Sequence, residues 1–117
     1  MPDDEYCYLT TTGRRTGRPH RIEIWYSLDG QTLYLLSGGG RSSDWVRNLE
    51  AAPEVQVELG EATHRARGRV LEGGDDEEER ARALVFDKYA VRVGRDLTDW
   101  RRRSLPVALD LAIDPEG

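Results

Sequence analysis

The stretch LTTTGRRTGRPHRIEIWYSLDGQTLYLLSGGGRSSDWVRNL, residues 9–49, decides how this chain folds. Its alternating apolar positions and turn residues predict, in order, a strand, a basic turn, a strand, a hairpin, a strand, a glycine run and a helix. The basic turn covers residues 13–18 and the glycine run covers residues 38–40. We expect both segments to face one groove and to hold a single elongated, anionic, ring-bearing cofactor.

The remainder of the chain continues the same pattern of short strands and helices. Asp29-Gly30 is a strong hairpin signal, and Pro53 stops the helix that begins at Ser42 or Ser43. The predicted strands cover residues 5–11, 20–27, 31–37, 55–59, 63–71 and 104–113. A second helix is expected from about residue 74 to before Gly94, with a short helical turn over 97–103. The pattern indicates a single α+β domain, residues 1–117, built on a small closed or partly open barrel with two crossover helices.

Composition and charge restrict the classes of function. The chain has 117 residues and a net charge of −5, so overall electrostatics disfavour nucleic acid as a partner. No apolar run approaches the roughly 18 residues that a membrane-spanning helix needs, so stable membrane insertion is not expected. The acidic N-terminus does not resemble a signal or transit peptide, which favours a cytoplasmic location. One cysteine and two distant histidines predict no metal site.

The basic turn combines two glycines with closely spaced cations. Arg14, Arg15 and Arg18 could clamp phosphate or carboxylate groups, and Thr16 could donate its hydroxyl. The spacing does not match the phosphate-binding P-loop pattern. An ordinary exposed turn with solvated arginines explains the residues equally well, so charge density alone leaves both interpretations open.

The glycine run lies between a strand and a helix. Gly38, Gly39 and Gly40 allow a flat ring to approach the backbone, and the start of the helix near Ser43 and Asp44 supplies N–H donors and positive potential. This environment suits the oxygen-bearing edge of a flavin-like ring. A flexible loop is the alternative for three glycines taken alone.

Two side chains are candidates for a catalytic role beside the ring. Tyr89, on the second predicted helix, and Ser37, at the end of a strand, could help to protonate a product. Phe86 and Tyr89 could also form a wall of the pocket. The alternative for Tyr89 and for the tryptophans is a place in the core or under a barrel lid. Cys7 lies in an alternating stretch and is expected to be a half-buried strand residue.

The sequence resembles the deazaflavin (F-420)-dependent nitroreductase family, also called the quinone reductase family. The resemblance depends on the run LTTTGRRTGRP, residues 9–19, taken together with the W-x-x-N-L-x-x-x-P-x-V run from Trp45 to Val55. It implies a split β-barrel of the FMN-binding type and a deazaflavin cofactor with a phosphate and a polyglutamate tail. It leaves open whether His20 or Arg21 takes a family basic position near the tail. The cofactor-binding residues that we expect are Arg14, Arg15, Thr16, Arg18, Ser37, Gly38, Gly39, Gly40, Arg41, Ser43, Asp44 and Trp45.

The resemblance implies an oxidoreductase that transfers a hydride from the reduced deazaflavin to a quinone, a nitroaromatic or an activated alkene. The expected partner is a small-molecule electron acceptor, and an exposed barrel edge is compatible with a homodimer. Two alternatives remain: an oxidoreductase of the same fold that binds FMN, and a protein that binds a flavin or deazaflavin without turnover.

Overall fold

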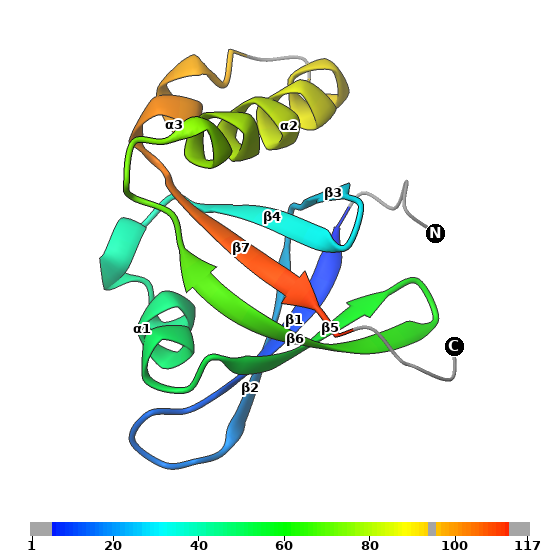
Figure 1. Ribbon diagram of the computed structural model, residues 1–117, viewed down its shortest axis with the longest axis vertical. Helices are drawn as coiled ribbons and strands as arrows, with labels where there is room; N and C mark the ends of the chain where they lie inside the picture. Colours follow the sequence, from blue (N-terminus) through cyan, green and yellow to red (C-terminus); the bar gives the residue numbers. More distant parts are fainter. Residues whose placement is uncertain (1–5, 94–95, 113–117) are drawn as a thin grey trace.

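The computed structural model describes residues 6–93 and 96–112, and within these residues seven strands form one antiparallel sheet (Figure 1). The order of the strands across the sheet is β2-β1-β5-β6-β7-β4-β3. The strands are β1 (Cys7–Thr12), β2 (Pro19–Ile24), β3 (Ser27–Asp29), β4 (Thr32–Ser37), β5 (Glu54–Leu59), β6 (Ala62–Val70) and β7 (Leu105–Leu111). The helices are the 3-10 turn η1 (Gly40–Ser42), α1 (Asp44–Ala51), α2 (Asp76–Val93) and α3 (Thr98–Arg103).

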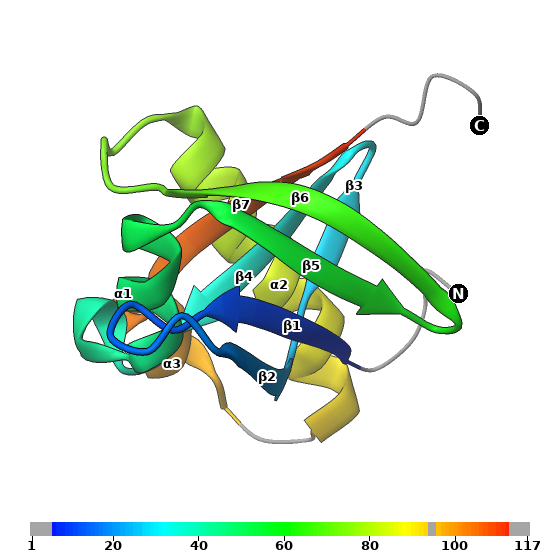
Figure 2. The same ribbon diagram turned by 90° about the horizontal axis from the view of Figure 1, so that it is seen from below.

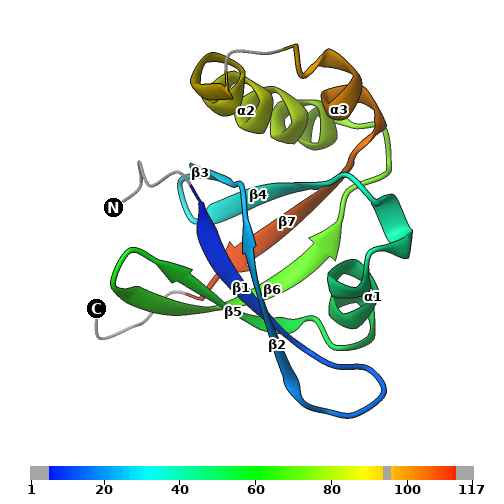
Figure 3. The ribbon, with the colours of Figure 1, turned by 180° about the vertical axis from the view of Figure 1, so that it is seen from behind.

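The sheet curls into a split barrel. Strands β2 and β3 are the two edges of the sheet, yet only Trp25 and Tyr26 separate them along the chain. The sheet must therefore curl until its two edges approach each other, and the views in Figures 2 and 3 show this curvature. This architecture confirms the predicted split-barrel fold.

The predicted strand over residues 20–27 is wrong in one respect, because it divides at Trp25. The cause is a contact with α2, more than sixty residues away. The Tyr89 hydroxyl accepts a hydrogen bond from the Tyr26 N–H at 3.0 Å and donates one to the Tyr26 carbonyl at 3.1 Å. The Trp25 ring stacks on the Tyr89 ring with centroids 4.3 Å apart and planes 4° apart. The backbone of Tyr26 therefore bonds to a side chain instead of a neighbouring strand.

The interior of the barrel is apolar. Leu9, Leu35, Val57, Val107 and Leu109 are fully buried there. Strands β1 and β5 alternate between buried and more exposed residues, as expected where one face is covered. Burial of these side chains is the main source of stability for a domain of this size.

Helices α2 and α3 form a second layer on the outer face of β4 and β7 (Figure 1). Tyr34 and Ala108 point out of the barrel and pack against Ala81 and Val85 of α2. Strands β4 and β7 are thus covered on both faces, which explains why their sequences are nearly continuous apolar runs.

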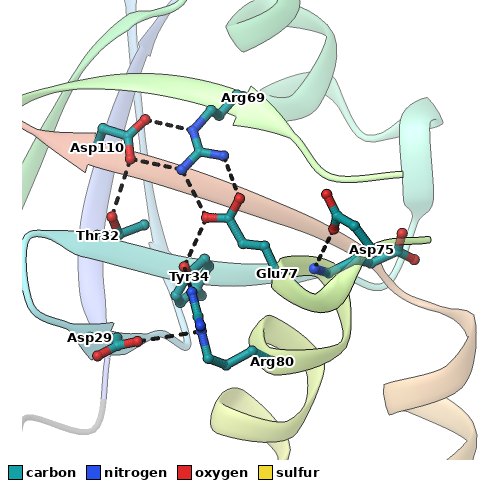
Figure 4. A network of polar contacts seen from close by, with 9 residues as sticks. Asp29, Thr32, Tyr34, Arg69, Asp75, Glu77, Arg80 and Asp110 are labelled. Carbon is teal, nitrogen blue, oxygen red and sulfur yellow. Dashed lines mark hydrogen bonds and ion pairs between the residues drawn. The ribbon is translucent and has the colours of Figure 1, made fainter. Parts of the chain in front are cut away.

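An ion-pair network ties α2 to the sheet (Figure 4). The guanidinium of Arg69, on β6, donates to Asp110 on β7 at 2.6 Å and to Glu77 on α2 at 2.8 Å. Glu77 also accepts a hydrogen bond from the Tyr34 hydroxyl at 2.9 Å. The Arg69 guanidinium holds the pKa of both carboxyl groups below their usual values.

Helix α1 packs on the barrel at Gly68 of β6, a position without a side chain. A Cβ atom at Gly68 of β6 would collide with the Leu49 side chain of α1, so the absence of a side chain at this position lets the helix approach the strand. The helix ends at Ala51, just before Pro53, as predicted. The Asp29-Gly30 hairpin is also confirmed, with Gly30 at φ 64°.

The other predicted elements correspond to observed ones with small shifts at their ends. The predicted limits Glu5 and Ile113 lie outside the described residues. No helix in the described part of the chain combines the length and the hydrophobicity required to cross a bilayer.

Candidate functional site

The basic turn between β1 and β2 is an ordered loop. Its ends are joined by hydrogen bonds from the Gly13 N–H to the Arg18 carbonyl at 2.7 Å and from the Gly17 N–H to the Gly13 carbonyl at 2.8 Å. Gly17 has a φ of 74°, and the Thr16 hydroxyl accepts a hydrogen bond from the Arg18 N–H at 3.2 Å. The turn is therefore a defined surface that can present its side chains in fixed directions.

Asn48 of α1 holds the turn in place. Its side-chain oxygen accepts hydrogen bonds from the Arg14 backbone N–H at 3.2 Å and from the Arg14 guanidinium at 2.8 Å, while its amide donates to the Thr11 hydroxyl at 3.3 Å. Arg14 also pairs with Asp44 at 3.2 Å. Arg14 therefore connects the turn to the first part of α1, and Asn48, which is only 3% exposed, is its anchor.

A hollow of about 390 Å³ is lined by residues of the turn and of α1. The Arg15 and Arg18 side chains form no ion pair among the described residues, so they remain available to an anion. The residues that line the hollow are Thr11, Gly13, Arg14, Arg15, Thr16, His20, Ile22, Asp44, Trp45 and Asn48. We call it the first hollow.

His20 and Arg21 differ in their position relative to the first hollow. His20 lines it. The Arg21 guanidinium instead forms two hydrogen bonds to the Glu58 carboxylate on β5, at 2.9 and 3.1 Å, and lies 3.9 Å from the centroid of the Tyr8 ring. This pairing lowers the pKa of Glu58.

The glycine run is fixed by hydroxyl groups. The Ser37 hydroxyl donates to the Gly40 carbonyl at 3.0 Å and lies 2.9 Å from the Ser43 hydroxyl. Ser43 occupies the N-cap position of α1, as predicted, but its side chain makes no capping hydrogen bond. The first N–H groups of α1 therefore have no side-chain cap and, with the helix dipole, favour an anionic or carbonyl group nearby.

The glycine run also borders a second hollow, of about 420 Å³. Gly38 approaches α3 closely, because a Cβ atom there would lie 3.7 Å from Nε1 of Trp100. The residues that line this second hollow are Gly38, Gly39, Gly40, Asp99, Trp100, Arg103 and Ser104.

The basic turn, α1 and α3 lie along one side of the barrel, and in Figures 1 and 3 α1 lies between the turn at one end of the long axis and α3 at the other. The two segments that the sequence singled out thus lie on the same side of the molecule. They line two different hollows, which differs from the expected single groove. The glycine run leads through η1 directly into Asp44 and Trp45 of α1, which belong to the first hollow.

The two predicted catalytic side chains are buried. Ser37 is 2% exposed, and its hydroxyl is bonded within the loop. Tyr89 is fully buried, and its hydroxyl bonds to the Tyr26 backbone. Both hydroxyls thus have hydrogen-bond partners within the fold. A role for either residue in protonating a product stays a prediction.

Arg41, one of the expected cofactor-binding residues, lines neither hollow. Its guanidinium pairs with Glu50 at 3.1 Å and with Glu72, so its charge is compensated by acidic neighbours. Cys7 lies in a strand, as expected, but it is fully buried instead of half-buried, and burial raises the pKa of its thiol to about 12.

Four residues that line the hollows were not among the predicted site residues: Asn48, Trp100, Arg103 and Ser104. Asn48 stands inside the W-x-x-N-L run, so its position carried a signal. The other three residues come together with the glycine run only through the packing of α3, more than sixty residues further along the chain.

The sequence of the chain is similar to those of known proteins. A family model described as F420H(2)-dependent quinone reductase matches residues 1–111. The F420H(2)-dependent quinone reductase Rv1261c of Mycobacterium tuberculosis (strain ATCC 25618 / H37Rv) is 31% identical over 87 residues, which cover 72% of this chain and 58% of that protein. The aligned part thus spans little more than half of that curated relative.

Solved structures share the fold. The structure of an F420-H2 dependent reductase (FDR-A) has a TM-score of 0.72 at 20% identity and covers 92% of this chain and 94% of its own. A structure described as a domain-swapped dimer has a TM-score of 0.73 at 20% identity, with 92% of this chain and 81% of that chain covered.

Proposed function

The chain belongs to the F420H(2)-dependent quinone reductase family, and we propose that it is an oxidoreductase that uses a reduced deazaflavin, coenzyme F-420, to reduce a small electron-poor acceptor. We further propose that residues 1–117 act as one cofactor-binding domain.

The observation that supports this proposal best is how the arginines of the basic turn are paired. Arg14 is bound to Asn48 and Asp44. Arg15 and Arg18 stand on the same ordered turn without an ion pair among the described residues. Arg15 lines the first hollow, whereas Arg18 belongs to the turn but not to this lining. Two cations on one turn without an ion pair among the described residues fit a ligand with several negative charges, such as the phosphate and polyglutamate tail of the deazaflavin.

The ring-bearing end of the cofactor is assigned to the start of α1 and the glycine run. The uncapped N–H groups of α1 would face the polar edge of the ring, and the lack of side chains at residues 38–40 leaves room for a flat group. We place the tail in the first hollow and the ring beside the glycine run, because this run leads through η1 into Asp44 and Trp45, which line the first hollow. When bound, the reduced deazaflavin supplies the hydride, and the acceptor takes up this hydride together with a proton.

In this proposal, the residues of the chain bind the cofactor and hold it in a fixed orientation. Arg15 and Arg18 bind the anionic tail, Asn48 keeps the turn in position, and Trp45 lines the first hollow. The Ser37 and Ser43 hydroxyls fix the glycine run, so that the hydride donor and the acceptor can meet at a defined distance.

Calorimetric titrations with coenzyme F-420 and with FMN test the proposal. We expect coenzyme F-420 to bind more tightly, and we expect the double variant Arg15→Ala/Arg18→Ala to lose affinity for coenzyme F-420 much more than for FMN. Arg67→Ala is the matched control, because Arg67 is an exposed arginine on β6 that pairs with Glu54. Tighter binding of FMN would favour the alternative cofactor and contradict the proposal.

Turnover is tested separately. Reduced coenzyme F-420 mixed anaerobically with the protein and a quinone, a nitroaromatic or an activated alkene should be oxidised at a rate proportional to protein concentration. Tight binding of coenzyme F-420 without oxidation by any of these acceptors would instead identify a non-enzymatic binding protein.

We also propose that the protein forms a homodimer. Strands β2 and β3 are edges of the sheet, and a structural neighbour is described as a domain-swapped dimer. Sedimentation velocity at micromolar concentration should give twice the mass of the chain; a single monomer peak would contradict this assignment.

A further inference from the structure

We infer that the second hollow binds the electron acceptor and selects planar acceptors that carry an anionic group, with Arg103 as the residue that sets this specificity. The inference rests on the proposed reductase function and adds a substrate class to it. It depends on the charge balance of the hollow, on one unpartnered hydroxyl and on the rigidity of the walls.

The charge balance of the hollow leaves one cation uncompensated. Two of its lining residues, Asp99 and Arg103, are charged. Asp99 pairs with Arg102 at 2.9 Å, so its negative charge is neutralised by its own helix. Arg103 is exposed and forms no ion pair among the residues that the structure describes. An anion that enters the hollow therefore meets a free guanidinium.

Ser104 provides a second, independent observation. This residue lines the hollow and is 2% exposed, and its hydroxyl oxygen has no hydrogen-bond partner in the described part of the chain. A buried hydroxyl without a partner costs free energy, so such groups usually indicate a missing ligand or water. A carboxylate or nitro oxygen held by Arg103, the preceding residue, is a suitable acceptor for this hydroxyl.

The walls of the hollow are suited to a flat molecule. The Trp100 ring packs edge-on against Trp25, with centroids 5.4 Å apart, and Trp25 in turn stacks on Tyr89. The glycine run adds no side chain to the lining, and Gly38 lies close to the indole edge, because a Cβ atom there would be 3.7 Å from Nε1 of Trp100. A planar aromatic or quinonoid acceptor can pack against the half-exposed part of this indole.

Arg82 of α2 fixes the end of α3 that carries these residues. Its guanidinium donates to the Ser104 carbonyl at 2.7 Å and to the Arg101 carbonyl, and it pairs with Glu78 at 3.1 Å. These bonds satisfy carbonyl groups at the C-terminus of α3, where a cation is favoured. Arg103 and Ser104 are therefore presented from a rigid support.

Binding of 4-nitrobenzoate and of its neutral analogue 4-nitrobenzamide to the protein without cofactor tests the inference. We expect the indole N–H resonance of Trp100, assigned with Trp100→Phe, to shift with either ligand. The anionic ligand should bind about tenfold more tightly than the neutral one. Arg103→Ala should abolish this preference, Arg103→Lys should restore part of it, and Arg67→Ala should leave it unchanged.

Kinetics supply the second measurement. With reduced coenzyme F-420 present, Arg103→Ala should raise KM for 4-nitrobenzoate about tenfold while kcat for this acceptor changes little, and KM for the neutral analogue should stay the same. An unchanged preference in Arg103→Ala, or ligand shifts confined to Trp45, would overturn the inference. If coenzyme F-420 itself fails to bind, the proposed function fails, whereas the cofactor-free binding result still decides the role of Arg103.

Discussion

Replacing Asn48 by alanine should both destabilise the fold and weaken cofactor binding. Asn48 is nearly inaccessible to water, and it forms hydrogen bonds to the Arg14 N–H, the Arg14 guanidinium and the Thr11 hydroxyl. The substitution removes all of these bonds and leaves the Arg14 N–H and the Thr11 hydroxyl without this partner. The turn then loses its connection to α1.

The expected loss in the free energy of unfolding follows from these hydrogen bonds. A neutral hydrogen bond contributes about 1 kcal/mol to stability, and a bond from a charged group contributes about 2 kcal/mol. Because the Arg14 side chain is 21% exposed, water replaces part of the lost interaction, and we expect a total loss of about 3 kcal/mol. For a domain of this size, this loss lowers the urea midpoint by roughly 2 M.

The assay combines urea unfolding, followed by circular dichroism, with calorimetric titration of coenzyme F-420. Asn48→Asp keeps the acceptor for Arg14 but loses the donor to Thr11, so it should lie between Asn48→Ala and the wild type in cofactor affinity. Gln56→Ala is the control, because it removes an exposed amide from β5. If Asn48→Ala unfolds at the wild-type urea concentration and binds the cofactor with wild-type affinity, the anchoring role of Asn48 is refuted.

Three further predictions follow from the same structure. Arg15→Ala and Arg18→Ala should each weaken binding of coenzyme F-420 by about tenfold in low salt and by less in high salt, since exposed charges are screened, and they should leave the urea midpoint unchanged; equal losses at all salt concentrations would contradict an electrostatic role. Gly68→Ala should destabilise the protein by about 1–3 kcal/mol in thermal or urea unfolding, because the new methyl group collides with Leu49; a neutral effect would show that α1 moves away freely. Because Arg69 lowers the pKa of Glu77 and Asp110, their contribution to stability should be complete above the ordinary carboxyl pKa of about 4 and should be lost as the pH falls towards the lowered values. Arg69→Met should make unfolding stability less dependent on pH between about 5 and 3, and an unaltered slope would exclude this network as its source.

Local signals allowed most elements to be predicted from the sequence. The Asp29-Gly30 turn, the stop at Pro53 and the alternation of Ile22 and Ile24 act over a few residues, and the structure contains the corresponding hairpin, helix end and strand face. The seventh strand escaped prediction because the break at Trp25 is caused by Tyr89, a contact that no local pattern reports.

The candidate site could be predicted only in part, because some of its features are local in sequence and others depend on long-range contacts. The basic turn and the glycine run are contiguous in sequence, so their composition identified them as candidates. The pairing of Arg14 with Asn48 and the pairing of Arg41 with Glu50 and Glu72 depend on which surfaces meet in the fold. Charge alone therefore could not tell the paired arginines from Arg15 and Arg18, which form no ion pair within residues 6–93 and 96–112.

A crystal structure of the protein in complex with oxidised coenzyme F-420 tests the central claim most directly. The account predicts that the tail contacts Arg15 in the first hollow and Arg18 on the same turn, and that the ring lies against the glycine run 38–40 beside the start of α1. A cofactor bound elsewhere on the barrel, or with its ring at the arginines and its tail in solvent, would contradict the account.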